Sequence, residues 1–227
     1  MTTRRNAIES LVAIGLIAAA HGTGSAAPLA ETTTGEKRIM RRKVGAIAQH
    51  GYVVTDAAKT AMQWARRVGV GPFYQFDQPI DNYIFRGKPV KLRIKTAVSY
   101  WNDIQIELIQ QVSPDESLYT EALRTAPNKL NHYATLVPDI DAGVTALDAE
   151  KYVVHRGGTA GGLKFVYLEK YLPDGSHLEL MQVPAANLAA FDGMKAVCQA
   201  WDGTNPLRTM AELMTDLGAL SKSAPPR

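Results

Sequence analysis

Hydrophobic and polar positions alternate in two widely separated parts of the chain, and each alternating run leads into a segment with helical spacing. The first run, around residues 46–54, precedes Asp56, and the second, around 130–137, precedes Asp139. Alternation with a period of two predicts a half-buried strand, and an aspartate directly before a helix-period segment predicts an N-cap. The pattern therefore predicts a strand and then a helix in each half, which indicates an internal duplication.

Each half ends with a further predicted strand, 103–111 in the first and 175–183 in the second. Both strands contain the pair Glu-Leu, which begins at Glu107 and at Glu179. Because side chains alternate between the two faces of a strand, one face of these strands is apolar, and the opposite face, with Ile109 and Met181 beside the glutamates, is mixed. The residues of the apolar face are Ile104, Ile106, Leu108, Leu178 and Leu180. We expect the apolar face to lie under the helices and the glutamates to line a cavity.

The order strand, helix and three strands occurs twice, with VVTD and LVPD before the helices, VGVGPF after the first helix, and IELIQQ and LELMQV at the ends. This arrangement resembles the vicinal oxygen chelate (glyoxalase) superfamily over residues 44–184. The resemblance implies an α+β fold, in which two tandem βαβββ modules form a curved eight-stranded mixed sheet. Module one would span 44–112, a connector 113–128 and module two 129–184.

The resemblance also implies a divalent metal in the concavity, bound by the first and last strands of each module. Counting back seven positions from the two capping aspartates reaches Gln49 and His132. With the two glutamates, the implied ligands are Gln49, Glu107, His132 and Glu179, a set similar to that of eukaryotic-type glyoxalase I enzymes. Zinc, nickel, iron and manganese all stay open as the metal.

His50 competes with Gln49 for the first ligand position, since a shift of one residue would exchange them. Only Gln49 keeps the spacing to Asp56 that His132 keeps to Asp139. We therefore prefer Gln49, and we expect His50 to point to the helix side, near Trp64 or Met62.

A divalent ion with open coordination positions can bind two adjacent substrate oxygens and stabilise an enolate. Glu179 and Glu107 are then the candidates for general acid and base. This chemistry favours a lyase or an isomerase/epimerase. A metal-free binding protein of the bleomycin-resistance type is the alternative. An extradiol-type dioxygenase needs a second histidine ligand, and His155 and His177 fall at no matching position.

Aromatic residues near the expected cavity mouth hint at an apolar or aromatic small-molecule substrate, although such residues are more often core. They are Phe73, Tyr74, Tyr100, Trp101, Tyr119 and Tyr167, with His177 as a further candidate contact. The sequence does not identify the substrate.

Residues 1–30 have the basic start, apolar middle and small-residue end of a signal peptide, and Arg4-Arg5 resembles a bacterial twin-arginine motif. Its apolar part is too short for a stable membrane span. We therefore expect a periplasmic or secreted protein, with Sec export as the alternative route. Glutathione adducts and coenzyme A thioesters are cytoplasmic, so export disfavours them as substrates.

The rest of the chain is expected to be a basic linker at 31–43 and a C-terminal helical extension with a disordered tail at 185–227. The net charge of +3 over 227 residues is too small to indicate nucleic-acid binding. Cys198 is the single cysteine, which excludes an internal disulfide. A homodimer stays open.

Overall fold

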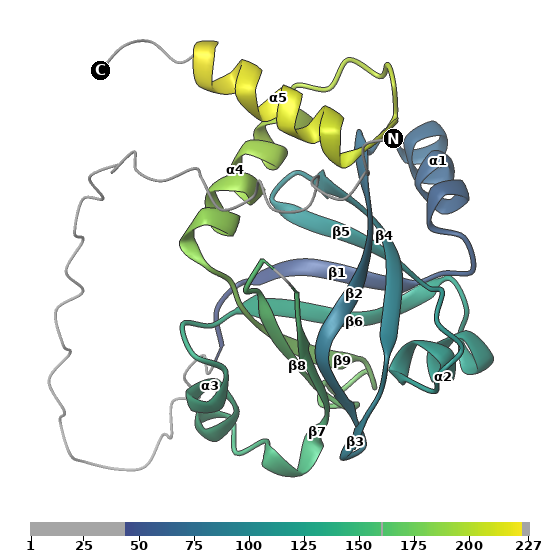
Figure 1. The fold of residues 1–227 in the computed structure, drawn as a ribbon, viewed down its shortest axis with the longest axis vertical. Helices are drawn as coiled ribbons and strands as arrows, with labels where there is room; N and C mark the ends of the chain where they lie inside the picture. The colour runs from purple at the N-terminus through teal and green to yellow at the C-terminus, as the bar shows by residue number, and fades with distance from the viewer. Residues whose placement is uncertain (1–43, 160, 224–227) are drawn as a thin grey trace, which may run out of the picture. The chain divides into compact units, whose positions relative to one another are not determined.

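The structure is a computed structural model and describes residues 44–159 and 161–223 (Figure 1). The predicted signal peptide and basic linker lie outside the described residues, as does the end of the tail.

Module one contains a long strand pair and one helix. Its elements are β1 (Ile47–Val53), α1 (Ala57–Val68), β2 (Phe73–Phe85), the short β3 (Lys88–Pro89), β4 (Leu92–Trp101) and β5 (Ile104–Gln111). The connector forms helix α2 (Leu118–Thr125). The carboxylate of Asp56 accepts a hydrogen bond from the Lys59 amide, so the predicted N-cap of α1 is confirmed.

Module two repeats this order on a smaller scale. Its elements are β6 (Lys129–Leu136), α3 (Ile140–Ala146), a 3-10 turn (Glu150–Tyr152), β7 (Val153–Gly158), β8 (Lys164–Leu168) and β9 (His177–Gln182). Asp139 caps α3 by accepting from the Ala142 amide, as predicted. Helix α4 (Ala185–Gln199), β10 (Leu207–Arg208) and helix α5 (Met210–Ser223) follow.

The strands form one mixed sheet in the order β10-β2-β4-β5-β1-β6-β9-β8-β7. The first strands of the two modules, β1 and β6, pair antiparallel, while β5 and β9 flank them in parallel. β2 also pairs with β7, where Ile84 is opposite Arg156, so the sheet curves until its outer strands meet. The predicted α+β fold with a curved sheet is confirmed. The sheet has ten strands instead of eight because β3 and β10 add to its edges.

The outer face of the sheet is covered by one helix from each module. Ile106 and Leu108 pack in the cluster beneath α1, and Leu178 and Leu180 pack in the cluster beneath α3. This confirms the predicted strand parity and directs Glu107 and Glu179 toward the inner face. A further cluster, which includes Ile109, Tyr119, Tyr167 and Met181, packs on the inner face of the curved sheet.

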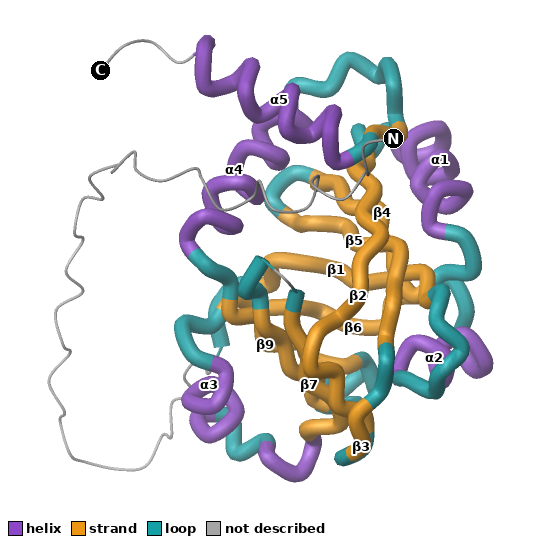
Figure 2. The backbone as a smooth tube through the Cα atoms, viewed as in Figure 1, coloured by secondary structure: helices purple, strands orange, loops and turns teal. Residues whose placement is uncertain are grey.

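Helices α4 and α5 stack on each other at one end of the sheet (Figure 2). Met194 and Cys198 of α4 and Leu213 of α5 pack against Tyr74 of β2 and Val98 of β4. The predicted C-terminal helices are thus part of the hydrophobic core.

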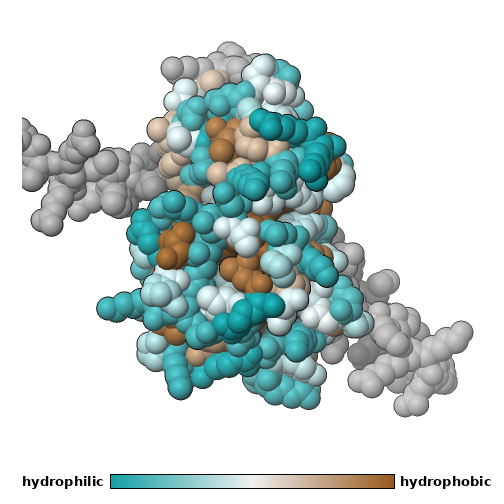
Figure 3. Space-filling view, turned by 90° about the vertical axis from the view of Figure 1, so that its right-hand side faces the viewer, coloured by the Kyte–Doolittle hydropathy of each residue, from teal (hydrophilic) through white to brown (hydrophobic). Residues whose placement is uncertain are grey.

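The surface in Figure 3 is mainly hydrophilic, with small and separate hydrophobic patches. The most exposed large hydrophobic side chain of the described residues is that of Trp101, at 51%. None of the described helices is long and apolar enough to cross a membrane.

Candidate functional site

The four residues proposed as ligands, called the quartet here, come from four neighbouring strands. β5 carries Glu107, β1 carries Gln49, β6 carries His132 and β9 carries Glu179. The strand register arranges their side chains in two adjacent rows on the inner face. One row is Gln105, Gln49, Ala134 and Glu179, and the other is Glu107, Gly51, His132 and His177.

The two small residues in these rows make the space that the quartet shares. A Cβ atom on Gly51 would lie 1.8 Å from Cε1 and 2.0 Å from Nε2 of His132. The imidazole therefore lies across β1, directly over Gly51. Ala134 stands between Gln49 and Glu179 in the other row, so its side chain there is only a methyl group.

The histidine lies close to both glutamates. Nε2 of His132 lies 3.2 Å from Oε2 of Glu179 and 3.9 Å from Oε2 of Glu107. The His132 side chain is fully buried and that of Glu179 is 4% exposed, whereas that of Glu107 is 19% exposed. The site is therefore most accessible on the side of Glu107.

Burial determines the protonation of these groups. It lowers the pKa of His132 to about 4, so the imidazole is neutral at neutral pH. Burial, with added repulsion from Glu179, raises the pKa of Glu107 to about 7. Burial raises the pKa of Glu179 to about 8, against a hydrogen bond from Tyr167 that lowers it.

The hydrogen bonds of His132 direct its free nitrogen to the glutamates. Nδ1 lies 3.2 Å from Oδ1 of Asn131, an amide oxygen that accepts a hydrogen bond, so Nδ1 carries the proton and donates. In that tautomer the lone pair of Nε2 faces the carboxylate of Glu179. Two lone pairs at this distance repel each other unless a proton or a cation lies between them.

Two oxygens of the quartet are buried without a hydrogen-bond partner in the described protein: Oε1 of Gln49 and Oε2 of Glu179. Buried polar atoms without partners are uncommon in native proteins and call for an explanation. A divalent cation bound by amide oxygen, carboxylates and neutral imidazole would satisfy both, so the residues fit such an ion. The described side chains do not form a ready-made cluster of three or more His, Cys, Asp or Glu ligands.

His50 lies on the opposite face of β1, as the parity predicts. Its ring packs edge-on against Tyr133, with a centroid distance of 5.0 Å. The expected neighbour Trp64 instead packs against Tyr52 and Trp101. The structure thus directs Gln49, and not His50, to the quartet.

Of the predicted substrate contacts, Tyr167 and Tyr119 lie next to the quartet. Oη of Tyr167 is 3.5 Å from Nε2 of His132 and 3.3 Å from Oη of Tyr119. Both tyrosines are at most 2% exposed, so they form an inner wall and not the mouth of the cavity that the sequence predicted.

The other aromatic candidates lie elsewhere. Phe73 packs on the outer face under α1, which corrects its predicted place at the cavity. Tyr74 is buried against α4 and α5, which corrects its predicted place at the cavity mouth. Trp101 is exposed and packs against Trp64 on the surface.

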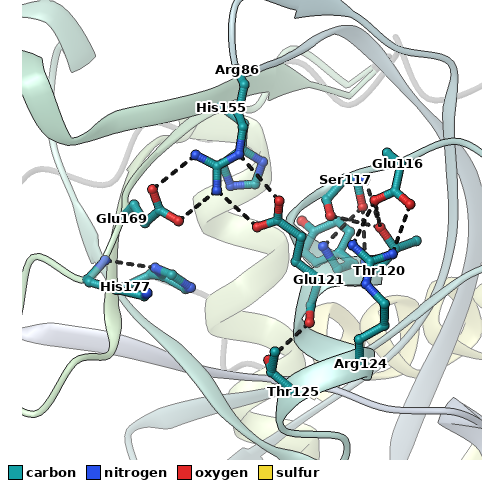
Figure 4. A network of polar contacts seen from close by, with 12 residues as sticks. Arg86, Glu116, Ser117, Thr120, Glu121, Arg124, Thr125, His155, Glu169 and His177 are labelled. Atoms are coloured by element: carbon teal, nitrogen blue, oxygen red, sulfur yellow. Dashed lines mark hydrogen bonds and ion pairs between the residues drawn. The ribbon is translucent and has the colours of Figure 1, made fainter.

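The other two histidines that the structure describes, His155 and His177, are at the end of the sheet that carries the Arg86 network (Figure 4). Nδ1 of His177 accepts a hydrogen bond from the Lys170 amide, and Arg86 makes ion pairs with Glu121 and Glu169. His155 is buried among aromatic rings, and its Nδ1 is 2.5 Å from Oη of Tyr83. Burial lowers the pKa values of His155 and His177, so both rings are neutral at neutral pH.

Comparison with known sequences identifies the family. Residues 48–167 match the family described as the glyoxalase/bleomycin resistance protein/dioxygenase superfamily. The chain belongs to this superfamily. The resemblance predicted from the strand pattern is therefore confirmed, although membership alone leaves open which activity of the superfamily the chain has.

Solved structures that match the chain include methylmalonyl-CoA epimerases. A variant of the methylmalonyl-CoA epimerase of Streptomyces coelicolor, in complex with 2-nitronate-propionyl-CoA, is 17% identical, with a TM-score of 0.48 and coverage of 63% of this chain and 96% of that one. The epimerase of Mycobacterium tuberculosis is 18% identical, with a TM-score of 0.46 and coverage of 68% and 97%. Likeness at this level gives no information about the substrate. No curated protein matches the chain.

Several residues next to the quartet were given no role from the sequence. Gly51, Ala134 and Gln105 are strand neighbours of the quartet, and Asn131 is the hydrogen-bond partner of His132. Gly51 lies two positions after Gln49, and Gln105 two positions before Glu107. Strand parity alone therefore places both on the inner face, which was the signal available.

Proposed function

We propose that this superfamily member is a metal-dependent lyase or isomerase/epimerase that acts on a small oxygenated compound. One observation carries the proposal: Nε2 of His132 and Oε2 of Glu179 face each other at 3.2 Å in a buried site, with a second carboxylate, Glu107, next to them. A divalent cation is the species that such a set of donor atoms stabilises best.

Gln49 would hold the ion through its unpartnered Oε1, His132 through Nε2, and Glu107 and Glu179 through their carboxylates. Zinc, nickel, iron and manganese all accept such donors. When bound, the ion would polarise two neighbouring oxygens of a substrate and stabilise negative charge on them during proton removal.

The glutamates supply the acid and base chemistry of the proposal. A carboxyl group whose pKa lies close to 7 can take up a proton and return it at physiological pH. Glu107 and Glu179, with pKa values raised to about 7 and about 8, meet this condition, and they approach His132 from two neighbouring strands. Removal of a proton by one carboxylate and its return by the other suits isomerisation or epimerisation.

A glutamine substitution separates base chemistry from folding. In Glu179→Gln we expect exchange of α-protons with deuterium oxide, measured over a panel of α-hydroxy acids and α-hydroxyketones, to fall about 10²–10⁴-fold while the fold is retained. Glu150→Gln, at an exposed position, is the control. Elemental analysis of the parent and of His132→Ala shows whether a metal is bound there.

An unchanged rate of α-proton exchange in Glu179→Gln would contradict the assignment of Glu179 as the base. Absence of metal from the parent, even after reloading, would contradict the proposed metal-dependent activity. It would favour the second candidate function, a metal-free small-molecule binding protein with Tyr119 and Tyr167 as its inner wall.

We also propose that the protein acts in the periplasm or outside the cell, after export through residues 1–30. The support is the basic start and Arg4-Arg5 pair of this segment. Replacement of both arginines by lysine should retain the protein in the cytoplasm, measured by cell fractionation and immunoblotting. Unimpaired export of that variant, together with export that depends on the Sec route, would contradict the twin-arginine assignment.

A further inference from the structure

A chain of side-chain hydrogen bonds runs from Tyr100 of β4, through Gln105 of β5, to Gln49, the first residue of the quartet. Nε2 of Gln49 donates to Oε1 of Gln105 at 2.6 Å, and Nε2 of Gln105 donates to Oη of Tyr100 at 3.0 Å. The three residues are direct neighbours across β1, β5 and β4. They therefore extend the row that contains Glu179.

These hydrogen bonds matter because a side-chain amide has two chemically different ends. Its oxygen can bind a cation, whereas its NH₂ group is only a donor. The amide nitrogen of Gln49 is turned toward Gln105, so Oε1 is the atom left without a partner in the buried site. With the two ends exchanged, an NH₂ group would face the quartet and would repel a cation.

Gln105 is well placed to maintain this orientation. Gln49 and Gln105 are each 4% exposed, so water does not compete strongly for their hydrogen bond. Gln105 lies on the same face of β5 as Glu107, two positions earlier, but its amide oxygen is already engaged by Gln49. It can orient the neighbouring side chain without itself approaching the quartet.

Tyr100 connects the hydrogen-bond chain to the C-terminal helices. Its ring packs against the hydrophobic cluster to which α4 contributes Met194 and Cys198. An ion pair between Lys195 of α4 and Asp103, at 3.5 Å, also ties the helix to the turn between β4 and β5. These helices follow residue 167, where the match to the superfamily ends.

We infer that Gln105 and Tyr100 are positioning residues, which hold the amide oxygen of Gln49 toward the quartet and depend on helix α4 for their own placement. The inference rests on the proposed function for its meaning, since an oriented amide oxygen serves to bind a cation. It assigns to residues outside the quartet, and to a segment beyond the matched part of the superfamily, a role in the site.

The test measures Zn²⁺ affinity by competition with a chromophoric chelator. In Gln105→Met, which keeps the length of the side chain but not its hydrogen bonds, we expect affinity about 10–100-fold weaker than in the parent. For Tyr100→Phe we expect a smaller loss, about 3–10-fold, because only the outer hydrogen bond is removed. Gln110→Met is the matched control: it is on the same strand, and its side chain accepts from the Ala57 amide away from the quartet.

A double variant distinguishes positioning from general damage to the fold. Once Gln49 is replaced by methionine there is no amide left to orient, so adding Gln105→Met should weaken Zn²⁺ binding no further. Equal losses in the presence and absence of Gln49 would overturn the inference, as would unchanged affinity in Gln105→Met.

A second measurement needs no metal. In ¹⁵N-labelled parent protein we expect the side-chain NH₂ group of Gln49 to exchange slowly with solvent, and in Gln105→Met to exchange at least tenfold faster. If the parent binds no Zn²⁺, Ni²⁺, Mn²⁺ or Fe²⁺, the proposed function fails and this exchange alone decides the positioning role. Identical exchange in parent and variant would overturn the inference whatever the metal result.

Discussion

At the scale of single residues, the absence of a side chain is as important to the site as the quartet itself. Gly51 and His132 are opposite each other on antiparallel strands, and the imidazole occupies the volume that any side chain at position 51 would need. The orientation of Nε2 toward the glutamates therefore depends on a glycine that carries no chemistry.

Replacement of Gly51 by alanine tests this dependence. The new methyl group would lie 1.8 Å from Cε1 of His132, so the imidazole must move or the strands must separate. We expect a loss of about 1–3 kcal/mol in the free energy of unfolding, as for other overpacked cores, measured by urea denaturation. Metal binding, where the parent shows it, should be lost as well.

The control is the same substitution in a His132→Ala background. Without the imidazole, the methyl group has space, so Gly51→Ala should then cost little. An equal cost in both backgrounds would show that alanine at position 51 acts on the strand itself and not through His132.

Much of the quartet could be predicted at this scale because strand parity and helix caps are local properties. Gln49 and His132 follow from their equal spacing to Asp56 and Asp139, both of which cap helices as expected. Gly51 could not be given its role in the same way. That role depends on its pairing with His132, and pairing between residues so far apart is determined by the register of the whole sheet.

At the scale of elements, the strands and helices of the two modules could be predicted from the sequence, but the long-range contacts between elements could not. Alternating patterns identify β5 and β9, because each has one face under a helix. The pairing of β2 with β7 and the packing of α4 against β4 join elements far apart in the chain. No local pattern specifies such contacts, so Tyr74 was expected at the cavity and is instead covered by helices.

The anchoring of α5 gives a prediction at this scale. Oδ2 of Asp216 accepts from the Tyr74 hydroxyl at 2.7 Å and from Nη1 of Arg208 at 2.8 Å. In Asp216→Ala the buried hydroxyl of Tyr74 loses its acceptor, and we expect about 1–3 kcal/mol less stability in urea denaturation.

Asp141→Ala is the matched control for the anchoring of α5. Asp141 pairs with Arg156 at the same 2.8 Å, but its side chain is 81% exposed, against 26% for Asp216. An exposed pair contributes little, so this variant should lose only a small part of what Asp216→Ala loses. Equal losses would contradict a structural role for the contact between α5 and β2.

At the scale of the whole molecule, burial of titratable groups links stability to pH in two opposite directions. The four histidines that the structure describes all have pKa values lowered from 6.5, with burial as the largest cause: His50, His132, His155 and His177. Below pH 6.5 the unfolded chain therefore binds more protons at these histidines than the folded one, so their protonation in acid destabilises the fold. The two glutamates of the quartet act in the other direction.

The pKa values of Glu107 and Glu179 are raised from 4.5 to about 7 and about 8, so between pH 4.5 and 8 the folded protein binds more protons at these groups than the unfolded chain. Their stabilising contribution is present in acid and is lost as the pH rises toward 8. Above pH 6.5 the histidines are neutral in both states, and only the glutamates count. Below pH 6.5 four histidines outweigh two glutamates. The metal-free protein should therefore be most stable near pH 6.5.

Urea denaturation in a chelating buffer between pH 4.5 and 8.5 measures this profile. We expect stability to decline on both sides of the maximum, by about 1–3 kcal/mol per pH unit, since each proton of difference contributes about 1.4 kcal/mol per unit. Glu179→Gln should flatten the alkaline side, and His155→Gln should flatten the acid side, because each removes one titrating group. Saturating metal should reverse the decline in stability at alkaline pH. A cation replaces the protons of the glutamates, and it binds more tightly as the glutamates lose those protons. Constant stability of the metal-free protein from pH 6.5 to 8 would show that the glutamates are not held in the protonated form by burial.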